Sequence, residues 1–213
     1  MNRKNTILIL SLIFFLIILT AVLTNNSILH SIDMKTASYA KHLRFSSLDK
    51  LMITISNFSR VIGSVFIFTI FSLVLFFRRK KKHLYLFISS FFLAIASEMI
   101  LKEIVERARP ISRLIVETSY SFPSAHSIVA VVFLLSSIIL IAPLIKKPFE
   151  KVIFILFVSI LFPLVIIGRI YLSAHYLSDV LASIFLGIAC FIIADIATEK
   201  SLLKNTKYVI NKK

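Results

Sequence analysis

Six long apolar runs constrain this chain more than any other feature of its sequence. They cover residues 6–23, 61–77, 84–101, 127–145, 152–167 and 180–197. Each run is close to the ~20 residues that a helix needs to cross a bilayer. A segment inside lipid must satisfy its backbone hydrogen bonds internally, so these spans are expected to be helical. The sequence therefore predicts an all-α integral membrane protein, with six transmembrane helices forming one domain over residues 1–213.

The net charge of +15 does not predict a nucleic-acid partner, because of where the basic residues lie. Six crossings place both termini on one side of the membrane, together with most of the 25 basic residues. The positive-inside rule assigns that side to the cytoplasm, and anionic lipid head groups are the expected partners of the charge. The basic residues expected on the cytoplasmic side are Arg3, Lys4, Arg78, Arg79, Lys80, Lys81, Lys82, Lys146, Lys147, Lys151, Lys200, Lys204, Lys207, Lys212 and Lys213.

The short basic loops are typical of a multi-pass protein of the bacterial cytoplasmic (inner) membrane. The first apolar run is longer than the apolar part of a signal peptide, and we therefore expect an uncleaved helix. Between the first two runs, apolar and basic residues alternate over 32–55. This pattern predicts one or two short helices that lie on the outer face of the cytoplasmic membrane. A plain connecting segment is the alternative.

Two further outer loops, 102–126 and 168–179, share one membrane face although two helices separate them. In the first, KEIVERARP places Lys102 and Arg109 two helical turns apart, about 10 Å on one helix face. Pro110 predicts that this helix ends at Arg109. Two cations at a helix end can hold an anion. The alternative is a surface stripe of i,i+4 ion pairs, Lys102–Glu106 and Glu103–Arg107, with Glu98 as another possible partner of Lys102.

The stretch SFPSAHS predicts a helix that begins after Ser124 as its N-cap. The amides of Ala125 and His126 would then point out of the helix end, where the helix dipole favours a phosphate. His126 could donate a proton to a group bound there. An ordinary cap with a hydrated interfacial histidine is the alternative.

The stretch RIYLSAHYLSD contains His175 and Asp179, which are neighbours on one helix face. A carboxylate beside one imidazole nitrogen fixes the tautomer and leaves the other nitrogen as a nucleophile. Arg169 can share their site only if the helix is interrupted between Arg169 and His175. We therefore expect Arg169 to end the fifth transmembrane helix and His175 to stand at the start of the sixth.

Together these residues suit phosphoryl transfer without a metal. His175 would attack phosphorus and His126 would protonate the leaving oxygen, while Lys102, Arg109 and Arg169 would neutralise the phosphate oxygens. The sequence has no Cys/His or carboxylate cluster with metal-ligand spacing, so no metal and no cofactor are expected.

At this point the chain resembles the type 2 phosphatidic acid phosphatase superfamily of membrane lipid phosphatases. That family carries the motifs K-x6-RP, PSGH and SR-x5-H-x3-D in this order on a six-helix frame. The chain reads KEIVERARP, PSAH and GRIYLSAHYLSD. The resemblance implies a phosphohistidine intermediate on His175, oriented by Asp179, with His126 as the acid. It also implies phosphate binding by Lys102, Arg109, Ser124, the amide of Ala125, and Arg169.

The chain departs from the family pattern at two positions. Ala125 replaces a glycine, so its methyl group could narrow the approach to phosphate and would oppose a positive φ. Gly168 replaces a serine and removes a hydroxyl donor.

The resemblance implies undecaprenyl pyrophosphate, phosphatidylglycerophosphate or phosphatidate as the substrate, at the outer face of the membrane. The alternatives are a lipid A phosphatase, a lipid phosphotransferase of the same family, or a non-enzymatic lipid-binding protein.

Overall fold

The computed structural model describes residues 3–59 and 61–210, and these residues contain helices and no strand. The prediction of an all-α protein is thus confirmed. The helices are α1 (Arg3–Leu23), α2 (Ser27–His42), α3 (Ser46–Phe58), α4 (Val61–Phe77), α5 (Lys81–Val105), α6 (Ala125–Ser136), α7 (Pro148–Tyr171) and α8 (Leu177–Ile210). A π-helical turn, Ser137–Ile141, and a 3-10 turn, Ala142–Leu144, continue α6.

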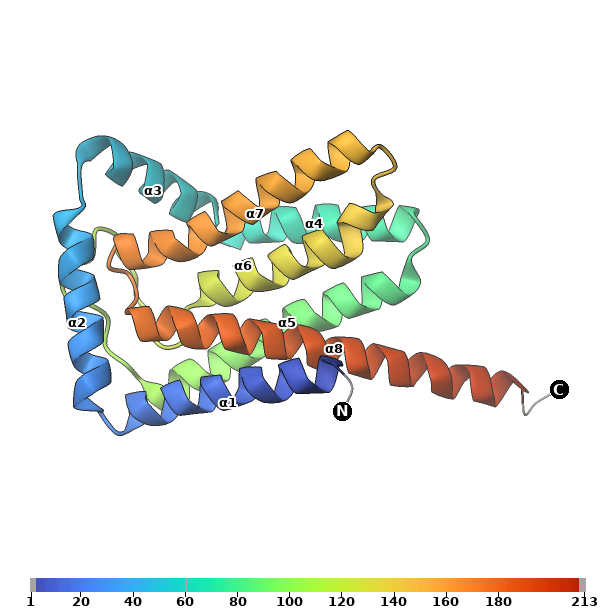
Figure 1. Ribbon diagram of the computed structural model, residues 1–213, viewed down its shortest axis with the longest axis horizontal. Coiled ribbons are helices and arrows are strands. Elements are labelled where there is room, and N and C mark those ends of the chain that lie inside the picture. The colour runs from blue at the N-terminus through green and yellow to red at the C-terminus, as the bar shows by residue number, and fades with distance from the viewer. Residues whose placement is uncertain (1–2, 60, 211–213) are drawn as a thin grey trace.

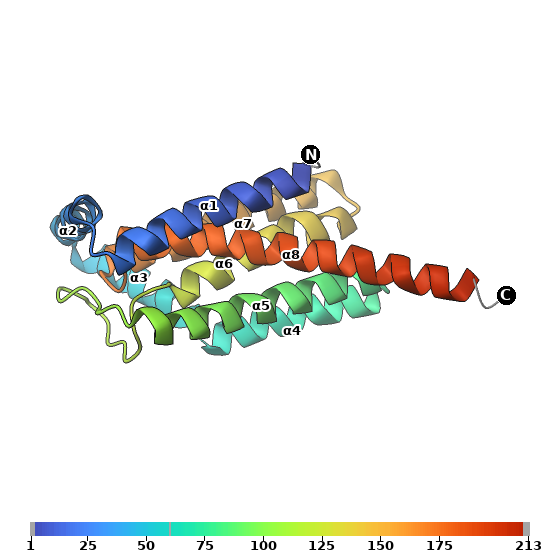
Figure 2. The ribbon, with the colours of Figure 1, turned by 90° about the horizontal axis from the view of Figure 1, so that it is seen from below.

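The long helices α1 and α4 to α8 run roughly along one direction, and α2 lies across one end of them (Figure 1). The loop between α5 and α6 and the turn between α7 and α8 lie at this same end (Figures 1 and 2). This end, which we call the α2 end, gathers segments that are far apart in the sequence.

Five of the described helices are long and apolar enough to cross a bilayer, namely α1, α5, α6 with its two following turns, α7 and α8. A sixth span is reached when α3 and α4 are counted together as one bent span. Helix α4 itself coincides with the apolar run at 61–77.

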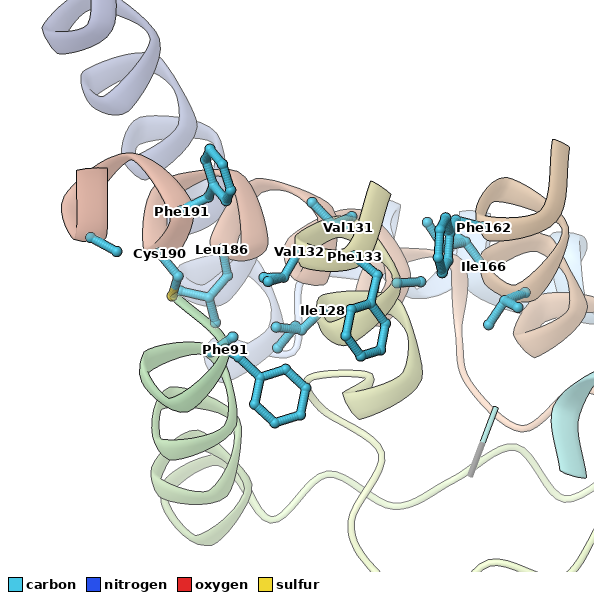
Figure 3. Close-up of a cluster of buried hydrophobic side chains, with 14 of the residues drawn as sticks. Phe91, Ile128, Val131, Val132, Phe133, Phe162, Ile166, Leu186, Cys190 and Phe191 are labelled. Carbon is cyan, nitrogen blue, oxygen red and sulfur yellow. The ribbon is translucent and has the colours of Figure 1, made fainter. Parts of the chain in front are cut away.

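Helix α6 forms the centre of the hydrophobic core, since it packs against α5, α7 and α8 (Figure 3). Its buried side chains meet those of the three neighbouring helices in one cluster. The cluster includes Phe91 from α5, Ile128, Val131, Val132 and Phe133 from α6, Phe162 and Ile166 from α7, and Leu186, Cys190 and Phe191 from α8. Because α6 begins at the α2 end, this packing fixes the position of its first turn.

Helices α6 and α8 approach each other closely at Gly187. A Cβ atom added there would lie 3.0 Å from the Cβ of Val131 and 3.2 Å from the main-chain oxygen of Ile128. The absence of a side chain at Gly187 therefore sets the distance between the two helices.

The segment expected at the membrane surface forms two helices, α2 and α3. Asn26 caps α2, since its side chain accepts the N–H groups of Ile28 and Leu29 at 3.1 Å. The buried residues of α2 are Asp33 and Ala40. A carboxylate is thus among the few side chains that α2 buries.

Helix α5 ends four residues earlier than the sequence predicts. Its last residue is Val105, and Glu106 adopts the left-handed conformation with φ of 47°. The N–H of Glu106 still makes the last helical bond, to the carbonyl of Lys102 at 3.0 Å, and its left-handed conformation then ends the helix before Pro110 can do so. The prediction that the helix extends to Arg109 is therefore wrong, and Arg109 lies in the following loop.

Candidate active site

Four segments meet at the α2 end and supply the expected site residues. They are the last turn of α5, the loop 106–124, the first turn of α6 and the turn 172–176 between α7 and α8. The loop is tied to the turn by the N–H of Leu114, which donates to the carbonyl of Leu172 at 3.0 Å. The N–H of Ser121 also donates to the carbonyl of Arg107 at 2.8 Å, which closes the loop on itself.

Lys102 and Arg109 meet at one serine, although they do not share a helix face. The Lys102 ammonium donates to the hydroxyl of Ser119 at 2.9 Å, and Nη2 of Arg109 donates to the same oxygen at 3.1 Å. Nε of Arg109 also donates to the main-chain oxygen of Ser119 at 2.7 Å. Lys102 pairs in addition with Glu98 at 2.7 Å, one turn earlier on α5. The two cations thus converge on an oxygen atom, as a phosphate site requires.

Arg109 also reaches the turn that carries His175. Its Nη1 donates to the main-chain oxygen of Ala174 at 2.8 Å and lies 3.1 Å from Nε2 of His175. One guanidinium therefore contacts both the loop and the histidine, and its fork of donors holds them in one geometry.

The contacts of His175 determine its tautomer. Nδ1 lies 2.7 Å from the main-chain oxygen of Ser121, and a carbonyl oxygen can only accept. Nδ1 therefore carries the proton. Nε2 faces Arg109, whose guanidinium can only donate, and so Nε2 presents its lone pair. The two contacts agree on a neutral imidazole with a nucleophilic Nε2 beside a cation.

Burial acts in the same direction as these contacts. His175 is 2% exposed, and the pKa of its imidazole is lowered to about 4, with desolvation as the largest cause. This value already includes the carboxylate of Asp179, which raises the pKa, and the charges of Arg169 and Arg109, which lower it. The cationic groups and burial together outweigh Asp179, so the imidazole is neutral at pH 7.

Asp179 lies one turn from His175 but is not its nearest partner. Its Oδ2 is 3.7 Å from Nδ1 of His175. The same oxygen accepts the hydroxyl of Ser121 at 2.5 Å and the N–H of Tyr176 at 2.9 Å. Oδ1 accepts Nη1 of Arg107, also at 2.5 Å. Asp179 therefore supplies negative charge beside the imidazole, and the main-chain oxygen of Ser121 accepts the direct hydrogen bond from Nδ1.

Ser124 is the N-cap of α6, as the sequence predicts. It is fully buried, and its hydroxyl accepts the N–H of Ser127 at 3.4 Å and the hydroxyl of Ser127 at 2.9 Å. The N–H of Ser124 donates to the hydroxyl of Ser183 on α8 at 2.7 Å. Ser124 thus joins the first turn of α6 to the helix that follows His175.

Ala125 is the first residue of α6 and does not have a positive φ. The concern that alanine opposes a required left-handed conformation therefore does not apply at this position. His126 follows in the same turn and lines a cavity of about 240 Å³. The other lining residues are predominantly apolar and come from α3, α4, α6 and α7 and the segment between α3 and α4. His126 thus lies where an apolar cavity meets the start of a helix.

Arg169 lies in the last turn of α7, and the chain breaks its helix between Arg169 and His175 as expected. Its main-chain oxygen accepts the N–H of Ala174 at 3.0 Å and that of His175 at 3.3 Å. Its guanidinium is fully buried, with Nη2 donating to Glu117 at 2.6 Å and Nη1 to Ser56 at 2.5 Å. Phosphate binding by Arg169 stays a prediction, since a carboxylate holds one end of this guanidinium.

Several residues that complete the site are not signalled by the sequence, chiefly Arg107, Asp33 and Ser121. The sequence indicates Arg107 only as an i,i+4 partner of Glu103, a pairing that loses its basis because the helix ends at Val105. Ser121 stands within SFPSAHS, but its contribution is a main-chain oxygen, which no residue type signals. Asp33 lies in a distant surface helix, and only its being a lone acid in α2 could have drawn attention to it.

The three motifs lie in a region that matches a known protein family. The model of the PAP2 superfamily matches residues 83–201, which include every expected site residue. Phosphatidylglycerophosphatase B of Bacillus subtilis (strain 168) is 30% identical over 194 residues, covering 89% of this chain and 94% of that protein.

Two solved structures are also similar. The crystal structure of a transmembrane PAP2 type phosphatidylglycerolphosphate phosphatase from Bacillus subtilis superposes with a TM-score of 0.78 and 28% identity, over 94% of this chain and 98% of that one. The crystal structure of Aquifex aeolicus LpxE superposes with a TM-score of 0.60 and 21% identity, over 76% of this chain and 93% of that one. The second likeness concerns the fold alone.

Proposed function

The chain belongs to the PAP2 superfamily and is a membrane lipid phosphatase, and on that premise we propose that it acts through a phosphohistidine on His175. The observation that carries this proposal is the state of the imidazole. Its Nδ1–H is bound by the carbonyl of Ser121, and its Nε2 lone pair faces Arg109. A buried, neutral histidine with one fixed nitrogen and one nucleophilic nitrogen beside a cation is suited to attack a phosphate.

The reaction has two steps. In the first, Nε2 of His175 forms a bond to phosphorus as the bond between phosphorus and the lipid oxygen breaks, and His126 donates a proton to that oxygen. In the second, water attacks phosphorus as the P–N bond breaks, and His126 accepts a proton from the water. Lys102 and Arg109 neutralise the phosphate oxygens in both steps, and the positive end of the α6 dipole adds to their effect.

We propose a glycerolipid phosphate as the substrate, with phosphatidylglycerophosphate first among the candidates. The similarity to phosphatidylglycerophosphatase B over most of both chains supports this choice. The apolar cavity of about 240 Å³ beside His126 also suits a lipid chain whose head group lies at the start of α6. We further propose that both termini are cytoplasmic and that the site faces the exterior of a bacterial cytoplasmic membrane, which the distribution of basic residues supports.

The test is phosphate release by the purified chain from four lipids, each assayed with and without EDTA. The lipids are phosphatidylglycerophosphate, phosphatidate, undecaprenyl pyrophosphate and lipid A. The wild type is compared with His175→Ala and with His42→Ala, a control at an exposed histidine in the last turn of α2. We expect release fastest from phosphatidylglycerophosphate, its loss in His175→Ala and its retention in His42→Ala.

Each other outcome removes a stated part of the proposal. Fastest release from another lipid overturns the substrate assignment and leaves the mechanism in place. Loss of activity in EDTA overturns the metal-independent mechanism. Wild-type turnover by His175→Ala overturns the nucleophile assignment, and a wild type inert on all four lipids favours the lipid-binding alternative.

A further inference from the structure

Asp33 is the most unusual residue of the surface helix α2. Its side chain is fully buried, whereas Ile28 and Tyr39 on the same helix are 70% and 65% exposed. Burying a carboxylate is costly unless charged or hydrogen-bonding partners compensate for the lost hydration. A surface helix that buries an acid while it exposes apolar side chains therefore points to a specific role for that acid.

Two of the hydrogen bonds of Asp33 come from Ser178, in the first turn of α8. Oδ1 accepts the N–H of Ser178 at 2.9 Å, and Oδ2 accepts its hydroxyl at 2.6 Å. Asp33 thus satisfies donors at the N-terminus of the helix that follows His175, from a position 145 residues away in the chain. A carboxylate there also interacts favourably with the positive end of the helix dipole.

The second partner of Asp33 is Arg107, which connects it to Asp179. Nη2 of Arg107 donates to Asp33 at 2.7 Å, and Nη1 donates to Asp179 at 2.5 Å and to the hydroxyl of Ser178 at 2.7 Å. The guanidinium lies 4.4 Å from the ring centre of Tyr176. Burial opposes the charged form of Arg107, yet the two carboxylates outweigh it and raise the pKa of this guanidinium.

We propose that Asp33 is a positioning residue of the phosphatase, which acts through Arg107 to hold the carboxylate of Asp179 beside His175. This inference rests on the proposed function, because it concerns how His175 is supported during phosphoryl transfer. It adds a residue of α2 to a site whose recognised motifs all come from residues 102–179.

The charges explain why Arg107 needs a second carboxylate. When Nε2 of His175 bonds to phosphorus, the ring gains positive character while Nδ1 keeps its proton. The negative charge of Asp179 stabilises that ring. If Asp179 alone faced Arg107, the guanidinium would cancel much of this charge. The carboxylate of Asp33 neutralises part of the positive charge of Arg107, and so the negative charge of Asp179 keeps its stabilising effect on His175.

A purely structural role for Asp33 makes a different prediction. If Asp33 only fastened α2 to α8, its loss would lower the stability of the protein and would change KM and kcat to similar extents. If Asp33 acts through Arg107 on Asp179, its loss lowers kcat and leaves KM almost unchanged. The side chain of Asp33 hydrogen-bonds to Ser178 and Arg107, not to Lys102 or Arg109, the expected phosphate-binding cations.

Asp33→Asn is the direct test, because asparagine keeps an acceptor oxygen for the amide of Ser178 and removes the charge that faces Arg107. The matched control is Asp49→Asn on α3. Asp49 also ties a surface helix to a helix end, since it accepts the hydroxyl of Tyr171 at 2.6 Å, but it is not in the Arg107 network. Kinetics are measured with phosphatidylglycerophosphate, or with the best lipid of the panel above.

We expect Asp33→Asn to lower kcat roughly 10-fold, as the loss of one charge-assisted hydrogen bond would. KM should change by less than about 2-fold, as expected for an interaction that matters in the transition state only. Asp49→Asn should turn over at nearly the wild-type rate. In an Arg107→Gln background, Asp33→Asn should lower kcat no further, because both substitutions interrupt one connection.

Four results would overturn the inference. They are wild-type kcat in Asp33→Asn, a change confined to KM, an equal loss in Asp49→Asn, or additive losses in Asp33→Asn and Arg107→Gln. If Asp33→Asn does not fold, Arg107→Gln measured alone replaces it, since it removes the connection from Asp33 to Asp179 and keeps the two bonds between Asp33 and Ser178. Wild-type kcat there also overturns the inference. A wild type without activity would instead mean that the proposed function fails.

Discussion

The Nδ1 atom of His175 lies 2.7 Å from the main-chain oxygen of Ser121, a full ångström closer than the 3.7 Å to the carboxylate of Asp179. The tautomer of the proposed nucleophile is therefore held by a main-chain atom. Asp179 acts on the imidazole directly through its charge. It also acts indirectly, because it accepts the hydroxyl of Ser121, the residue whose main-chain oxygen binds Nδ1. This division of roles leads to a specific expectation for Asp179.

Asp179→Asn should lower kcat by about 100-fold, less than the ~10⁴-fold that follows when a histidine loses the only group fixing its tautomer. The carbonyl of Ser121 still fixes Nδ1–H in this variant, while the stabilising charge is gone. KM should stay near the wild-type value, because Lys102 and Arg109 are unchanged. Steady-state kinetics beside His175→Ala give the measurement. A raised KM with wild-type kcat, or activity as low as that of His175→Ala, would contradict this account.

The pH dependence of kcat/KM should reflect the buried state of His175. Burial lowers the pKa of its imidazole to about 4, so Nε2 becomes protonated and loses its lone pair only below that pH. Activity should therefore be retained well below the ordinary histidine pKa of about 6.5 and be lost around pH 4. A phosphate monoester titrates near pH 6, so the profile is best read between about pH 3 and 5. An acidic midpoint at the ordinary histidine value would contradict the burial argument.

Arg109→Lys should impair both binding and turnover. The guanidinium contacts Ser119 through Nε and Nη2 and contacts Ala174 and His175 through Nη1, and an ammonium group on a flexible stem cannot reproduce that fork. We expect kcat/KM to fall at least about 10-fold, the effect of losing one or more charge-assisted hydrogen bonds. Lys102→Arg serves as the reciprocal control, because it keeps the charge at the neighbouring position. Wild-type kcat/KM in Arg109→Lys would show that its geometry is unimportant.

Two glycines of the transmembrane helices should respond differently to alanine. At Gly187 an added Cβ meets Val131 at 3.0 Å, so Gly187→Ala should destabilise the packing of α6 on α8 by about 1–3 kcal/mol. At Gly168 the nearest atom is Sδ of Met52 at 3.6 Å, an ordinary contact, so Gly168→Ala should be neutral or stabilising. Thermal unfolding in detergent compares the two. Equal effects would contradict the close packing at Gly187.

The same contact bears on one departure from the family pattern. Because a Cβ atom fits at position 168, Gly168→Ser should fold normally and turn over within about 2-fold of the wild type, as most substitutions without steric conflict do. The Cβ atom of the serine typical of the family is therefore compatible with the packing of α7 against α3. Loss of folded protein in Gly168→Ser would contradict this.

The helical fold was predictable because the apolar runs are long and unambiguous. The end of α5 was not, because Glu106 takes a left-handed conformation that its residue type does not signal. Pro110 predicted a later end, and this error kept Arg107 on a helix face beside Glu103. The network of Arg107 therefore depended on a backbone detail that only the structure supplies.

The candidate site was predictable where spacing alone brings residues together, as for His175 and Asp179. Contacts across the chain were not predictable, because no local pattern links Asp33 to Ser178 or Glu117 to Arg169. The bond between Arg169 and Glu117 changes the expectation for Arg169 most, since an acid occupies part of a guanidinium that was expected to face phosphate. The role of Ser121 rests on its main-chain oxygen, and the sequence carries no signal for that.

The most direct test of the central claim is to trap the phosphorylated enzyme. The wild type is mixed with a lipid labelled in its phosphate group, quenched rapidly in alkali, where phosphohistidine is stable, and mapped by peptide mass spectrometry. The account predicts one phosphoryl group on His175, lost on acid treatment and absent from His175→Gln. Turnover by the wild type with no trapped phosphoryl group, or with the group on another residue, would contradict it.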